Sequence, residues 1–241
     1  MNDKEKISIE HLVQAYDAYV ECGTSKMWEE KELFLLIDYF AVERQYERSL
    51  EICEEGINHF PYSLTFYLKK VIYLLELNKV DEVNAILEHV NALSPGNHVV
   101  TLLHARLLFK THNNDEALSL ISGLEGKLDE IRTCEMLLLK ANILEEEGHN
   151  EGIFQILSQA VLLDASNEEA IEYFWAWIES YKKYEEGILI FGKILDSNSY
   201  NGLSWYYLGL SQAYLGNYDE ALEALEFAYL STPTLEIAYR E

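Results

Sequence analysis

The sequence is poor in positive charge. It carries 18 lysines and arginines against 42 aspartates and glutamates, a net charge of −24 over 241 residues. Phosphate backbones are repelled by such a surface, so we expect no nucleic-acid partner. Up to residue 120 there are 11 basic and 20 acidic residues, and beyond it there are 7 and 22. A basic partner would therefore be attracted, chiefly to the C-terminal half.

Membrane-spanning and secretory features are missing as well. No uncharged apolar run reaches 18 residues, and the N-terminus MNDKEKISIEHL lacks the apolar stretch of a signal peptide. The three cysteines, Cys22, Cys53 and Cys134, are too few and too widely spaced for a disulfide framework or a zinc site. We therefore expect a cytoplasmic protein with no membrane partner.

Common catalytic motifs are also absent. The chain contains no GxGxxG, GxxxxGK[ST], GxSxG or HExxH sequence. His98 and His104 are six residues apart, the wrong spacing for two ligands on one helical face. The acids Glu145–Glu147 are consecutive, and consecutive helical residues point about 100° apart, so they cannot converge on one cation. The sequence predicts no enzyme activity, no metal site and no cofactor.

Proline is scarce, and its placement indicates a repeat. Pro61 and Pro95 are 34 residues apart, and Pro233 lies 138 residues further on, which is four such intervals plus two residues. Because proline ends helices, prolines in one phase mark the ends of repeated helical hairpins. The two additional residues are expected near 123–129. With 49% apolar residues and 12 glycines, the composition suits a mostly helical protein.

The most regular repeat is WYYLGLSQAYLGNYDEALEALEFAYLSTP, residues 205–233. Gly216 and Asn217 can end one helix, and acids at 219–220 can start the next. Gly209 occupies a position where two helices approach closely. The equivalent position holds Trp175 one repeat earlier, where a large ring should push its two helices apart or turn outward.

The residues Trp205, Leu208, Gly209, Tyr218, Ala221, Ala228 and Pro233 resemble the tetratricopeptide-repeat signature in type and spacing. The resemblance implies an all-α fold, a right-handed α-α superhelix of about six helix hairpins. The predicted repeats are 31–62, 63–96, 97–130, 131–166, 167–200 and 201–233. Residues 1–30 are predicted to supply an N-terminal capping helix at 8–22, and 234–241 to begin a further helix or form a tail.

Each repeat should contain two helices. First helices are predicted near 31–43, 63–77, 97–111, 130–147, 167–181 and 200–215. Second helices are predicted near 46–58, 80–91, 114–124, 150–163, 184–196 and 218–231. Asn97, Asn167 and Asn198 are suited to cap the N-termini of first helices.

In arrays that resemble this one, the first helices line a concave groove that binds ligands. Here that groove is predicted to be mixed and partly basic near the N-terminus, and rich in tyrosine and glutamate near the C-terminus. Tyrosine supplies rigid contact area together with a hydroxyl group, which suits recognition of an extended peptide. The candidate ligand-binding residues are Lys69, Arg106, Lys110, Glu145, Glu172, Tyr173, Glu179, Tyr206, Tyr207 and Tyr214.

The function predicted from these features is non-catalytic binding of a protein or peptide with basic and apolar residues, weakened by salt. A second hypothesis is a structural scaffold that forms homo-oligomers through its uncapped C-terminal repeat. A third is a helical-toroid hydrolase with two carboxylates in a central cavity. A closed toroid is a poor match for a chain of this length with one fixed repeat phase.

Overall fold

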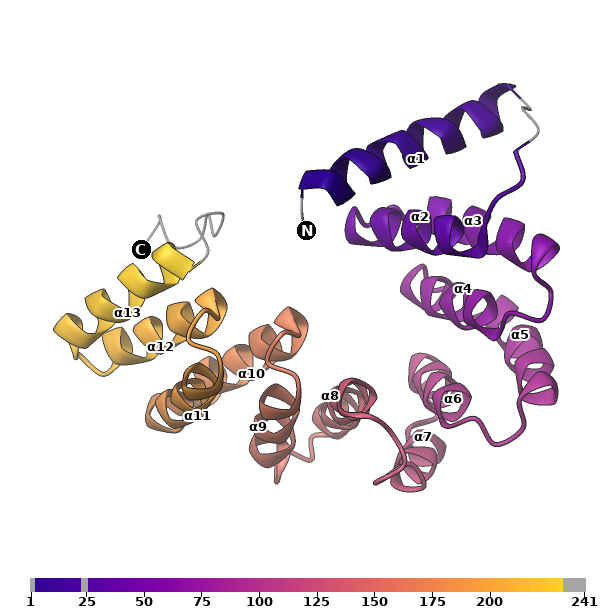
Figure 1. The fold of residues 1–241 in the computed structure, drawn as a ribbon. Helices are drawn as coiled ribbons and strands as arrows, with labels where there is room; N and C mark the ends of the chain where they lie inside the picture. The colour runs from indigo at the N-terminus through magenta and orange to yellow at the C-terminus, as the bar shows by residue number, and fades with distance from the viewer. Residues whose placement is uncertain (1–2, 23–25, 232–241) are drawn as a thin grey trace. The chain divides into compact units, whose positions relative to one another are not determined.

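A computed structural model describes residues 3–22 and 26–231 of the chain. These residues form thirteen α-helices and no strand (Figure 1). The chain divides into two compact units, residues 1–120 and 121–241, which are considered separately. The predicted segment 234–241 lies outside the described residues. Among the helices described, none is long and apolar enough to span a lipid bilayer.

The N-terminal helix α1 is followed by six pairs, each with a first and a second helix. The bounds in the N-terminal unit are α1 Asp3–Cys22, α2 Glu30–Val42, α3 Tyr46–His59, α4 Leu64–Glu76, α5 Val80–Leu93, α6 His98–Lys110 and α7 Asn114–Ser122, which contains the division. Those in the C-terminal unit are α8 Glu130–Glu146, α9 Ile153–Leu163, α10 Glu168–Tyr181, α11 Tyr184–Ser197, α12 Gly202–Tyr214 and α13 Tyr218–Ser231. This is the predicted all-α helical repeat.

The predicted helix ends agree with these bounds to within three residues, except that α1 starts at Asp3 rather than near residue 8. The predicted start of α9 near 150 is three residues early. Gly152, just before the helix, has a φ of +87°, a left-handed conformation that the helix cannot contain. The turn at 148–152 is therefore longer than the other turns within pairs.

The turns within the six pairs share one backbone geometry. Each contains a residue with positive φ, at positions spaced by 34 or 36: Arg44, Asn78, His112, Gly148, Lys182 and Gly216. The N–H of the following residue donates to a carbonyl five residues back, as in Gln45 to Phe40 at 2.8 Å and Asn217 to Gln212 at 3.0 Å. This is a Schellman-type ending, and it satisfies carbonyls that the helix end leaves open.

Side-chain capping of the first helices is partly as predicted. Asn97 accepts a hydrogen bond from the backbone N–H of Val99 at 2.9 Å, and Asn167 accepts one from Ala170 at 3.0 Å. The prediction for Asn198 is wrong, because Asn198 ends α11. Asn201 caps α12 instead, since its side chain accepts from the N–H of Ser204 at 2.9 Å. Asn201 lies 34 residues after Asn167, so the repeat phase pointed to it.

In the N-terminal unit the core is built from large side chains of successive pairs. Phe40 and Phe66 are fully buried, and a Cβ on Gly56 of α3 would lie 2.4 Å from the Phe66 ring, so only glycine fits there. Helix α1 packs on this core through Tyr16, whose ring centroid is 5.6 Å from that of buried Trp28. The N-terminal capping helix therefore covers the apolar side of the first pair, as solenoid ends require.

In the C-terminal unit the pair α12–α13 crosses closely at Gly209. A Cβ on this glycine would lie 2.8 Å from Leu225 Cγ and 3.2 Å from the carbonyl oxygen of Ala221. One repeat earlier, Trp175 does not face solvent, and α10 and α11 approach each other less closely along their lengths than α12 and α13 do, as expected of a large ring at this position. The Trp175 ring is buried and stacks on Tyr207 of α12 at 5.0 Å, while Gly187 supplies the small residue on α11, next to Ile178.

Candidate functional site

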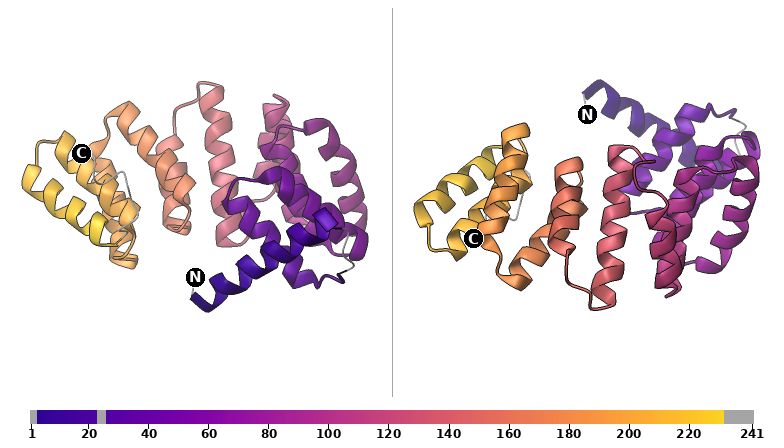
Figure 2. Two further views of the ribbon diagram at one scale, coloured as in Figure 1. Left: turned by 90° about the horizontal axis from the view of Figure 1, so that it is seen from above. Right: turned by 90° about the horizontal axis from the view of Figure 1, so that it is seen from below.

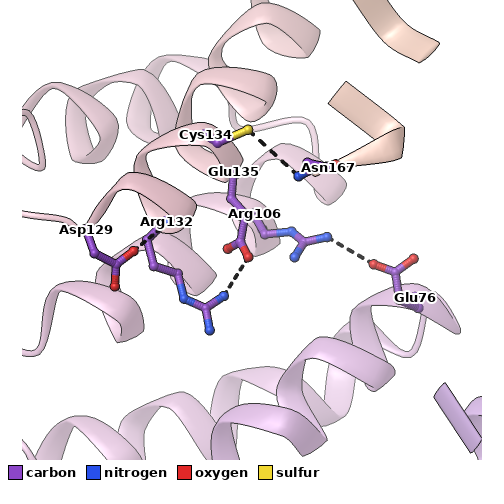
Figure 3. A network of polar contacts seen from close by, with 7 residues as sticks. All are labelled: Glu76, Arg106, Asp129, Arg132, Cys134, Glu135 and Asn167. Carbon is purple, nitrogen blue, oxygen red and sulfur yellow. Dashed lines mark hydrogen bonds and ion pairs between the residues drawn. The ribbon is translucent and has the colours of Figure 1, made fainter. Parts of the chain in front are cut away.

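Ion pairs link successive first helices in the N-terminal unit. The Lys69 ammonium of α4 pairs with Asp38 of α2, and Arg106 Nη2 of α6 lies 3.0 Å from Glu76 Oε1 of α4 (Figure 3). Lys110, the third predicted basic residue, is exposed in the last turn of α6. Two of the three predicted basic residues are thus already matched by a carboxylate of the preceding first helix.

The C-terminal unit makes the same kind of link with a neutral donor. The Tyr173 hydroxyl of α10 donates to Glu145 Oε2 of α8 at 2.7 Å. The Tyr214 hydroxyl of α12 donates to Glu179 Oε1 of α10 at 3.1 Å. These four residues were all predicted for the site, and the structure brings them together in two pairs. Because a phenol carries no charge, both carboxylates keep their full negative charge.

The phenols of this region are held in the protonated state. Burial raises the pKa of Tyr173 well above its ordinary value, and the hydrogen bond to Glu145 raises it further. Burial, reinforced by the negative charge of Glu172, raises the pKa of Tyr207 to about 12. Both side chains therefore act as neutral hydrogen-bond groups at any physiological pH.

Aromatic rings pack around these pairs and form what we call the aromatic cluster: Trp175, Tyr184, Tyr207 and Tyr214. Trp175 stacks on Tyr207 at 5.0 Å, and Tyr184 stacks on Tyr214 at 4.7 Å with an interplanar angle of 6°. Trp175 lies 6.3 Å from both Tyr184 and Tyr214, which joins the two stacks. Tyr214 is 56% exposed, whereas Trp175 and Tyr207 are each 8% exposed. The outer face of the cluster is therefore Tyr214.

The remaining predicted residues differ in their accessibility. Glu172 is exposed on α10, whereas Tyr206 is buried with its ring centroid 5.2 Å from that of Tyr207. Tyr206 and Tyr207 therefore support the surface from beneath. Sequence reasoning did not assign Trp175 or Tyr184 to the site. The recurrence of a turn tyrosine at Tyr184 was the available signal, because that position begins a second helix next to the following first helix.

The described residues offer little for metal or thiol chemistry. Nowhere in 3–22 and 26–231 do three histidine, cysteine, aspartate or glutamate side chains gather closely enough to hold one metal ion. Cys53 and Cys134 are buried free thiols, and burial raises the pKa of each to about 12. Cys134 is contacted by Asn167 Nδ2 at 3.8 Å (Figure 3). Both thiols behave as apolar packing groups.

No family model matches the sequence, and no curated protein matches it. Solved structures do match its fold. A structure of the APC/C hetero-tetramer Cut9–Hcn1 is similar with a TM-score of 0.56 and 10% identity, covering 96% of this chain and 45% of the other. Pseudomonas aeruginosa pilF matches with a TM-score of 0.54 and 9% identity, covering 88% and 95%. PilW, a type IV pilus biogenesis factor, matches with a TM-score of 0.54 and 11% identity, covering 87% and 96%.

Proposed function

We propose that this chain, which has the tetratricopeptide-repeat-like fold, is a non-catalytic protein-interaction module. The proposed binding surface is carried by the first helices α8, α10 and α12 of the C-terminal unit, and we call it the first-helix surface. Its ligand is a peptide or protein segment with basic and apolar residues. The observation that carries this proposal is that Glu145 and Glu179 are held by tyrosine hydroxyls rather than by cations.

The charge of the surface favours a basic ligand. Helix α10 contains four glutamates, at 168, 169, 172 and 179, and no lysine or arginine. Glu172 and Glu179 are exposed on this helix. Carboxylates oriented by a hydroxyl are fixed in position and still attract a cation, whereas Asp38 and Glu76 on the first helices of the N-terminal unit are already paired with Lys69 and Arg106. Lysine or arginine of a ligand would therefore gain most beside Glu179, which Tyr214 orients, and Glu172 two turns earlier on the same helix adds a second negative charge.

The aromatic cluster favours an apolar or planar neighbour next to that charge. Tyr214 exposes more than half of its surface and is held flat against Tyr184. A fixed ring contributes contact area without the entropy cost of immobilising a flexible side chain. A guanidinium group can also stack on a tyrosine face while it pairs with a carboxylate. A ligand that alternates basic and apolar residues would use both features.

A peptide library read at two salt concentrations tests this proposal. We expect capture of basic, apolar peptides at about 50 mM salt and about tenfold or more weaker binding at about 300 mM. The double substitution Glu172→Gln with Glu179→Gln should weaken the best peptide by about tenfold. Glu223→Gln with Glu226→Gln on α13 is the matched control, because it changes the net charge equally on the same unit and should have little effect.

Equal losses from the two double variants would mean that only the net charge attracts the peptide, and the first-helix surface would then be the wrong assignment. Tyr214→Ala is the second variant. It should weaken binding severalfold without changing the salt dependence, because it removes contact area and no charge.

A second candidate function is a scaffold that self-associates through its last pair. On α13, Tyr218 is 73% exposed and Leu222, one turn later on the same face, is 61% exposed. Adjacent apolar side chains of this kind favour contact with another surface. Light scattering over a range of concentrations tests it. A mass that rises with concentration, and that Leu222→Lys returns to the monomer value, would favour the scaffold.

A further inference from the structure

A pocket of about 360 Å³ lies between α1 and α3 in the N-terminal unit. Helix α1 runs along the α2–α3 pair in both figures of the fold (Figures 1 and 2). The pocket is lined by Tyr16, Asp17, Val20, Glu21, Arg48 and Glu51. The pocket belongs to a different unit from the first-helix surface. Binding at the pocket is therefore a separate question from the proposed function, and one can fail without the other.

Arg48 is the one cationic residue of the lining, and it already contacts two other residues. Arg48 pairs with Asp17, and its guanidinium carbon lies 4.0 Å from the centre of the Phe40 ring. The carboxylates of Glu21 and Glu51 are exposed at the same pocket. With Arg48 and Asp17 cancelling one another, the lining keeps two negative charges.

Tyr16 provides a second, independent sign of a ligand. It is only 3% exposed, and its hydroxyl has no hydrogen-bond partner within 3–22 and 26–231. Its ring is fixed between Tyr19 and Trp28, with centroids 6.1 and 5.6 Å away. Burial, assisted by the charge of Glu51, raises the pKa of Tyr16 to about 12, so the hydroxyl remains neutral. The rest of the side chain is covered, so this hydroxyl is available at the pocket to donate to or accept from a bound group.

We propose that this pocket binds the side chain of a lysine or arginine residue from a partner protein. The cationic end lies between Glu21 and Glu51, the Tyr16 hydroxyl accepts one of its hydrogen bonds, and Val20 covers its methylene groups. An alkyl chain with a terminal cation matches this lining, since long basic side chains combine an apolar stem with a charged end.

NMR titration of the full chain tests the pocket with defined probes. The probes are the N-acetyl methylamides of lysine and arginine, with the norleucine derivative as an uncharged control. We expect the lysine or arginine derivative to shift amide signals of residues 16–21 and 48–51 and the indole signal of Trp28, whereas norleucine leaves them unchanged. Equal shifts with norleucine, or no shift with either basic probe, would overturn the proposal.

Substitutions locate the binding and separate it from a general charge effect. Glu21→Gln with Glu51→Gln should weaken the basic probe by about tenfold. Glu43→Gln with Glu47→Gln, a pair outside the lining but in the same unit, removes equal charge and should change affinity less than about twofold. Equal losses in both would overturn the site. Markedly tighter binding of spermidine than of either derivative would assign the pocket to a free polyamine and also overturn the proposal.

Discussion

Four of the six hairpin turns place a residue other than glycine in the left-handed region. Arg44, Asn78, His112 and Lys182 have φ values between +52° and +58°, whereas Gly148 and Gly216 fill the other two positions. A left-handed conformation costs a residue with a Cβ roughly 1 kcal/mol, and asparagine tolerates it best. The turn geometry is thus maintained by the helices on either side, and three turns carry avoidable strain.

Lys182→Gly is therefore expected to stabilise the chain. Glycine adopts the observed φ of +52° without steric cost, so the free energy of unfolding should rise by about 0.5–1 kcal/mol. Urea unfolding measures this. Lys183→Gly is the matched control, because Lys183 has a φ of −93° and gains nothing from glycine. A destabilised Lys182→Gly variant would show that the lysine makes a compensating contact.

Ser204 gives a second prediction at the scale of one residue. It is fully buried in α12, and its hydroxyl has no partner in the described part of the chain. Ser204→Ala should raise the free energy of unfolding by about 1 kcal/mol, since an unsatisfied buried hydroxyl is removed. Ser211→Ala is the control, because the Ser211 hydroxyl donates to the carbonyl of Tyr207 at 2.8 Å. An equal gain from both would contradict the explanation.

The close crossing of α12 and α13 gives a prediction at the scale of the helix. Gly209→Ala improves helix propensity by about 1 kcal/mol but places a Cβ 2.8 Å from Leu225 and 3.2 Å from a backbone oxygen. We expect a net loss of about 1–2 kcal/mol from the overpacking. Gly192→Ala on α11 is the control, because nothing lies within 4 Å of its Cβ and only the propensity gain of about 0.5–1 kcal/mol applies. Thermal unfolding measures both variants: Tm should fall for Gly209→Ala and rise for Gly192→Ala.

The sequence predicted the helices well, because repeated 34-residue spacing specifies which segments are helical and where they turn. It predicted side-chain directions less well. Trp175 was expected to push its two helices apart or turn outward; α10 and α11 do approach each other less closely than α12 and α13, but the ring is buried and stacks on Tyr207 of the next repeat, which was not predicted. Tyr206 was assigned to the binding surface and is buried. The direction of a side chain depends on neighbours from another repeat, and spacing along one helix does not contain that information.

At the scale of the whole chain, raised tyrosine and cysteine pKa values give a pH dependence. Tyr16 and Tyr207 have pKa values near 12 against an ordinary 10.0, and Cys53 and Cys134 have values near 12 against 9.0. Raised folded-state values mean that the unfolded chain loses protons first as pH rises. The stabilisation is therefore complete below pH 9 and is lost between about pH 9 and 12, at roughly 1.4 kcal/mol per pH unit per group.

Urea unfolding at pH 8, 9, 10 and 11 measures this loss. Replacing Cys53 by alanine lowers stability at every pH by leaving a small cavity, but it should flatten the decline that begins near pH 9, where the thiols of the unfolded chain lose their protons ahead of most phenols. Stability that stays constant to pH 11 would show that these groups ionise equally in the folded and unfolded chain.

The shared turn makes one whole repeat the natural unit by which this chain can change in length. Removing residues 79–112 would join Asn78 directly to Asn113, which occupies the same place after its turn as Lys79 does after Asn78. The rejoined backbone would keep the same Schellman ending, and the shortened chain would lose one pair of helices and no other junction. A deletion that joins non-equivalent positions of two repeats would instead break the turn or a helix at the junction. Length variation in such a chain is therefore quantised, and natural or engineered variants should differ by whole periods.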